Sequence, residues 1–69
     1  MSNADRVVLF LTELGLTEHA NTLIDAGFDS MVMLTVLSFD QLLGLKIPKG
    51  HAQLILKGLE VSAIKSMEE

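Results

Sequence analysis

Residues that start or stop helices divide this sequence at short intervals. Glycine follows an apolar helical pattern at Gly15 and again at Gly27, where a left-handed backbone conformation commonly ends a helix. Pro48 disfavours helical geometry at the residue before it and suits the first turn of a new helix. No segment alternates polar and apolar side chains for long enough to predict a strand. The pattern therefore predicts four short helices and a longer one at the carboxyl end.

Candidate capping residues precede the first three apolar patterns. Asn3 is predicted to cap a helix over residues 4–14, and Thr17 to cap a second helix that runs to the next glycine. Ser30 is predicted to begin a short third helix over residues 31–36, where valine and threonine lower the helix propensity. Each stop signal thus lies a few residues before a start signal.

The last two helices have the clearest local signals. Ser38 and Gln41 form an S-x-x-Q capping box, which predicts a fourth helix that ends by about residue 46. A fifth helix is expected over residues 48–67. Apolar residues at helical spacing predict the buried face, and they are Val7, Phe10, Leu11, Leu14, Ala20, Leu23, Ile24, Ala52, Ile55, Leu56, Leu59 and Ala63. Short helices joined by short turns predict a compact all-α bundle.

Length and composition limit the possible functions. The 69 residues contain no cysteine, so a disulfide scaffold, a thiolate zinc site and a thiol nucleophile are excluded. The formal net charge of −4 argues against a basic nucleic-acid binder. The apolar runs are shorter than the roughly 18 residues that a membrane span needs. With no signal peptide in evidence, we expect an intracellular protein, cytoplasmic with a nuclear location as the alternative.

No residue pattern predicts an enzyme. His19 and His51 lie far apart in the sequence and share no local metal-ligand spacing, so both are expected to be surface or capping residues. Ser30 and Ser38 are explained as helix caps, and neither a G-x-S-x-G motif nor a phosphate-binding glycine loop is present. We therefore expect no catalytic residue, no cofactor and no metal site.

Taken in order, these segments resemble the sterile alpha motif (SAM) domain family. The resemblance covers about residues 7–59 and rests on an ordered set of motifs, namely F-L-x-x-L-G-L, T-E-H-A, G-F-D, L-S-F-D-Q-L and L-K-I-P-K-G-H. It implies a compact five-helix SAM-like bundle with a long C-terminal helix. It also implies a single SAM-like domain over residues 1–69, with a core over about residues 5–62.

The chain departs from the usual family pattern at several positions. Phe10 stands where the family usually has tryptophan, His19 where it often has tyrosine, and Leu23 where it often has phenylalanine. Lys46 replaces a common glycine, and Ala52 replaces a common arginine. The last change removes a side chain that would pair with a carboxylate in bidentate fashion.

The resemblance implies a non-enzymatic protein–protein interaction module of a larger intracellular protein. SAM domains commonly associate with themselves or with other SAM domains, in scaffolding or signalling, through a basic end-helix face on one copy and an acidic mid-loop face on the next. Here the end-helix face would comprise Lys46, Lys49, Gly50, His51 and Lys57. The mid-loop face would comprise Asp25, Asp29, Met33 and Asp40. Such a heterologous contact does not close and forms open chains.

Other interpretations remain open at the level of sequence. The acidic residues could be ordinary solvated charges, since Asp29 and Asp40 suit a loop and a helix start. A monomeric SAM domain could bind a non-SAM protein, an RNA hairpin or a lipid surface. Five Lys and Arg residues in total argue against RNA, so we expect a protein partner, with neither nucleic acid nor membrane.

The chain also has more apolar residues than the predicted buried face requires, since its mean hydropathy is +0.45. One part of the surplus lies in residues 31–36, which cannot all be buried; the apolar residues there are Met31, Val32, Met33, Leu34 and Val36. The rest of the surplus comprises Val8, Leu9, Val61, Ile64 and Met67. Leu42 and Leu43 cannot both be buried either. These residues form either ordinary surface or an apolar patch for a partner.

Overall fold

The computed structural model describes the backbone of residues 2–68 and the side chains of residues 2–61. The five expected helices are all present, and no strand occurs within residues 2–68. In chain order the elements are α1 (Asn3–Glu13), a 3₁₀ turn η1 (Thr17–His19), α2 (Ala20–Asp25), α3 (Met31–Leu34), α4 (Phe39–Gly44) and α5 (Lys49–Glu68). The all-α fold class predicted from the sequence is confirmed.

The first two predicted N-caps are wrong. Ser2, not Asn3, caps α1, because its hydroxyl accepts a hydrogen bond from the Asp5 backbone while the Asp5 carboxylate accepts one from the Ser2 backbone. Thr17 does not cap α2 with its side chain. Its hydroxyl donates to the Thr12 hydroxyl at 3.0 Å, and the chain enters α2 through a 3₁₀ turn.

The serine caps and the proline lie close to where the sequence predicts them. The Ser30 hydroxyl accepts from the Met33 backbone at 3.2 Å, although α3 ends at Leu34 and is shorter than expected. Ser38 and Gln41 form the predicted capping box of α4. The Pro48 carbonyl accepts the Ala52 backbone N–H, so Pro48 immediately precedes α5.

Three helices end in the same left-handed turn. In α1 the Leu16 N–H donates to the Leu11 carbonyl, and in α2 the Phe28 N–H donates in the same way to the Leu23 carbonyl. The residue just before each donor is left-handed: it is Gly15 in the first turn and Gly27 in the second, with φ angles of 74° and 99°. Helix α4 ends in the same way. The Ile47 N–H donates to the Leu42 carbonyl, and the left-handed residue before the donor is Lys46. These are Schellman motifs, in which glycine is the usual left-handed residue.

Lys46 therefore occupies a position that favours glycine, since its φ is 67°. We expect Lys46→Gly to raise the free energy of unfolding by about 0.5–1 kcal/mol. Relief of the left-handed strain, about 1–2 kcal/mol, exceeds the entropy that glycine adds to the unfolded chain. Urea unfolding followed by circular dichroism measures the change.

Lys49→Gly is the matched control, because it removes the same side chain at an exposed position of α5 that is not left-handed. It should lower the free energy of unfolding by up to about 1 kcal/mol. Equal losses in the two variants would show that the turn at Lys46 does not strain a lysine.

Among residues 2–61, twelve buried apolar residues from all five helices and the turns between them form one core cluster. Its members are Val7, Leu11, Leu16, Ala20, Leu23, Leu34, Leu37, Leu42, Ile47, Ala52, Ile55 and Leu59. Of the predicted buried face, Phe10, Leu14, Ile24 and Leu56 are only partly buried against this cluster. The side chain of Ala63 lies outside the described residues.

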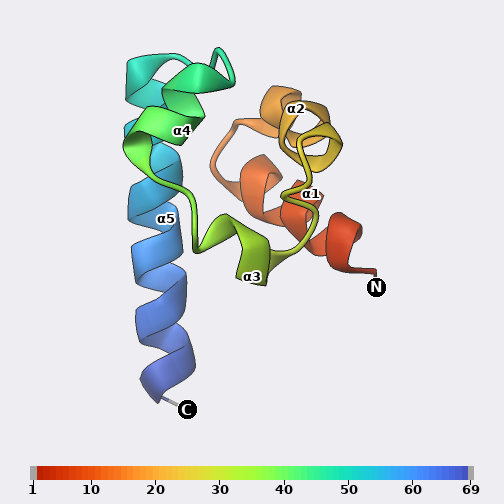
Figure 1. The fold of residues 1–69 in the computed structure, drawn as a ribbon. Helices are drawn as coiled ribbons and strands as arrows, with labels where there is room; N and C mark the ends of the chain where they lie inside the picture. Colours follow the sequence, from red (N-terminus) through yellow and green to blue (C-terminus); the bar gives the residue numbers. More distant parts are fainter. Residues whose placement is uncertain (1, 69) are drawn as a thin grey trace.

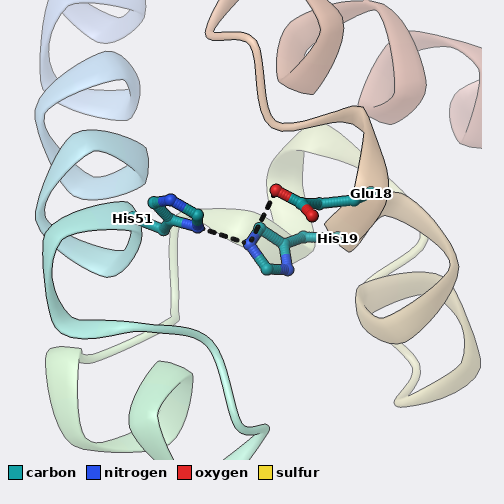
Figure 2. Close-up of polar contacts among 3 residues, drawn as sticks. All are labelled: Glu18, His19 and His51. Atoms are coloured by element: carbon teal, nitrogen blue, oxygen red, sulfur yellow. Dashed lines mark hydrogen bonds and ion pairs between the residues drawn. The ribbon is translucent and has the colours of Figure 1, made fainter.

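Helix α5 runs along one side of the bundle, and its carboxyl half extends past the other helices (Figure 1). Helix α4 packs against α5, whereas α1 contacts η1, α2 and α3. Among the described residues, no helix is both long and apolar enough to cross a membrane. The arrangement brings the start of α5 and the start of α2 to face each other across the bundle (Figure 2).

Candidate functional site

Lysines gather around the start of α5. Lys46 lies in the turn before the helix, and Lys49 and Gly50 lie in its first turn; all three are exposed. The first N–H groups of a helix have no intrahelical acceptor and mark the positive end of its dipole, and the first turn of α5 contains no acidic residue. The side chains and the helix end therefore give this end of α5 a positive character.

The residues predicted for the end-helix face do not all lie on one side of α5. At about 100° per residue, Lys57 is about 80° around the helix from Lys49, whereas His51 is about 160° from it. Lys57 is exposed and His51 is partly buried. The two lysines and Gly50 therefore share a solvent-facing side, while His51 turns towards the start of α2 (Figure 2).

His51 and His19 form a hydrogen-bonded pair. Nε2 of His19 lies 2.8 Å from Nδ1 of His51, with the ring centroids 5.1 Å apart and the rings inclined at 60°. One nitrogen must donate and the other accept, depending on the tautomers. The Glu18 carboxylate lies 3.9 Å from the same His19 nitrogen. The sequence predicts that both histidines are surface or capping residues; they are instead partly buried and bonded to each other, because the fold joins positions 32 residues apart.

The residues predicted for the mid-loop face are all exposed, but they lie in two regions. Asp25 ends α2, Asp29 lies in the following loop, and Met33 lies in α3 with an exposed fraction of 40%. Asp40 lies in the first turn of α4, the helix that packs against α5. A carboxylate there also favours α4 by complementing its dipole.

Within residues 2–61 no lysine or arginine lies within ion-pair distance of a carboxylate. The one ion-pair geometry in this part of the chain is Glu18 with His19. Lys46, Lys49 and Lys57 therefore have no carboxylate partner among these residues. Their charges are available to a second molecule.

The surplus apolar residues are largely on the surface. Val32 and Val36 are 74% and 62% exposed, while Leu34 between them is fully buried. Leu42 is buried and Leu43 is exposed, which confirms the prediction that the two cannot both be buried. The exposed residues also include Leu9 and Val61, whereas Val8 and Met31 pack partly against the core. The side chains of Ile64 and Met67 lie outside the described residues.

Leu54 is an exposed apolar residue that the sequence analysis missed. It is 41% exposed and lies about 60° around α5 from Lys57. The signal was available in the sequence, because Leu54 falls outside the helical stripe formed by Ala52, Ile55 and Leu59. Its exposure places an apolar contact beside Lys57.

The fold and these surfaces define a small all-helical domain with charged and apolar residues presented for contact. The chain matches the family model of the SAM domain (Sterile alpha motif) over residues 1–63 and belongs to this family. SAM domains are generally protein-interaction modules, and they often bind other SAM domains. No curated protein and no solved structure matched the chain.

Proposed function

We propose that this domain associates head to tail with another SAM domain, either a second copy or a related one. The lysines at the start of α5, namely Lys46, Lys49 and Lys57, would contact the acidic set Asp25, Asp29 and Asp40 of the next molecule. The observation that carries the proposal is that these lysines are exposed and have no carboxylate partner within residues 2–61.

The backbone at Lys46 supports this role. A non-glycine residue in a left-handed turn costs stability, and residues with such strain cluster at functional sites. Glycine, which fits the equivalent turns after α1 and α2, would fit here at lower cost. A lysine in this position adds positive charge next to Lys49.

Both proposed surfaces also carry exposed apolar side chains. Leu54 lies beside Lys57 on α5. Val32 and Met33 lie on α3, which follows the loop that contains Asp29. Interfaces that combine an apolar centre with a charged rim are typical of specific protein contacts. The charges would then set the orientation and the apolar residues would contribute burial.

We expect Lys49→Glu to abolish self-association, because the new carboxylate would face the acidic residues of the neighbouring copy. Like-charge contacts cost several kcal/mol, equivalent to a loss of affinity of more than about 100-fold. Sedimentation velocity over a range of concentrations should show concentration-dependent association of the parent chain and monomers of the variant. Raising the salt from 0.1 M towards 1 M should weaken the parent association, because the screening length falls from about 10 Å to about 3 Å.

Arg6→Glu is the matched control, since it makes the same charge reversal at an exposed position of α1 outside both faces. It should associate like the parent. Asp29→Lys should also be monomeric alone, but an equimolar mixture with Lys49→Glu should form a 1:1 dimer, since each variant retains one intact face. Unchanged sedimentation of Lys49→Glu, or a parent chain that stays monomeric and binds no other SAM domain, would overturn the proposal.

A further inference from the structure

The donor atoms of Glu18, His19 and His51 converge at the junction between η1 and α5 (Figure 2). One ligand atom from each residue lies within 4.8 Å of the other two. The two imidazoles are partly buried, and the His19 side chain is only 12% exposed, whereas the Glu18 side chain is 66% exposed. Two fixed nitrogen donors and one adjustable oxygen donor therefore approach a common point.

These distances are close to those of a tetrahedral metal site. Zinc binds imidazole nitrogen and carboxylate oxygen at about 2.0–2.2 Å, which places neighbouring ligands of a tetrahedron about 3.3 Å apart. The two histidine nitrogens are 2.8 Å apart and would have to separate by about 0.5 Å. The Glu18 oxygen, 3.9 Å from His19 Nε2, would have to approach that atom by about 0.6 Å. The three ligand atoms lie within 4.8 Å of one another, so the longest separation would have to shorten by up to about 1.5 Å, a movement open to the exposed Glu18 side chain.

The protonation of the pair is compatible with metal binding. In the neutral pair one of the two facing nitrogens carries the shared proton. If that imidazole changes tautomer, its proton moves to the outer ring nitrogen, and both facing nitrogens then offer a lone pair. The exchange needs no net release of protons from neutral rings.

We propose that Glu18, His19 and His51 form a zinc-binding site that links η1 to α5. Two imidazoles and a carboxylate are a donor set suited to zinc, and three protein ligands leave the fourth position to water. The metal would bridge two positions 32 residues apart, so its binding would stabilise the folded state. The proposal is independent of the head-to-tail association.

Titration of the chain with zinc chloride in a calorimeter should give one equivalent bound. Zinc at about 100 times its Kd should raise the midpoint of thermal unfolding by about 10–20 °C, and EDTA should reverse the shift. His51→Asn should lower the zinc affinity by about 100-fold or more, because loss of even an outer-shell partner costs about 10- to 100-fold.

Glu18→Gln changes an exposed side chain, so this variant should keep the fold intact. It should weaken zinc binding, while Glu13→Gln, a carboxylate in α1, should not. Cobalt(II) in place of zinc should show the intense visible absorption of tetrahedral coordination in the parent and lose it in His51→Asn. Zinc affinity retained in His51→Asn, or a parent chain that binds no zinc and holds only the hydrogen-bonded pair, would overturn the proposal.

Discussion

Replacing Leu34 with alanine should lower the free energy of unfolding by about 2–5 kcal/mol. Leu34 is the one buried residue of α3, and its side chain is fully buried. A four-residue helix has little stability of its own, so α3 depends on this side chain to hold it against the core. At about 0.05–0.15 kcal/mol per residue, a domain of this size has a total stability of about 3–10 kcal/mol. The substitution should therefore remove a large part of the free energy of unfolding of the domain.

Val32→Ala is the matched control, because Val32 belongs to the same helix and is 74% exposed. Its effect should stay within about 0.5 kcal/mol. Urea unfolding monitored by circular dichroism compares the two variants directly. If Leu34→Ala unfolds at the same urea concentration as Val32→Ala, α3 does not contribute to the core in the way described.

Replacing Gly58 with leucine should lower the free energy of unfolding by about 1–3 kcal/mol. A Cβ atom at Gly58 would lie 3.0 Å from Phe10 Cζ and 3.1 Å from Leu14 Cδ1. The absence of a side chain therefore allows α5 to approach α1 closely. Leucine is a better helix former than glycine by nearly 1 kcal/mol, but steric conflict with two apolar side chains should outweigh that gain.

Gly50→Leu separates helix propensity from packing. Gly50 also lies in α5, but nothing lies within 4 Å of a Cβ atom built there. This variant should be as stable as the parent or slightly more stable, whereas Gly58→Leu should unfold at a lower temperature and a lower urea concentration. Equal gains in stability from both substitutions would mean that α1 and α5 move apart at little cost.

The sequence predicted most of the fold because its signals are local. A glycine in a left-handed turn, a serine cap and a proline before a helix act within four residues of themselves, so Gly15, Gly27, Ser38 and Pro48 mark helix boundaries without knowledge of the tertiary structure. The error at Thr17 arose because the chain enters α2 through a 3₁₀ turn, and no side chain caps that helix. The error at Asn3 arose because Ser2 and Asn3 are both suitable caps for α1. The choice among them depends on backbone geometry to within one residue.

The candidate surfaces were predicted only in part. The lysines around the start of α5 followed from their order in the sequence, as did their exposure. The sequence analysis did not separate His51 from these lysines, because residues 46–51 form one continuous basic segment in the sequence. The rotation of about 100° per residue in α5 turns His51 away from Lys49. Leu54 was missed although the predicted stripe of Ala52, Ile55 and Leu59 already leaves it on the outer side of α5, where it is 41% exposed.

The sequence by itself determined the number and order of the helices, most of their ends, the apolar stripes and the family, because each depends on spacing along short segments. Only the tertiary structure decided that His19 meets His51 and that Gly58 lies against Phe10. The physical reason is that such contacts join residues more than 30 positions apart, and their geometry depends on how all five helices pack together. The lysine at position 46 gives no local sign of its positive φ, although the family commonly has glycine at this position.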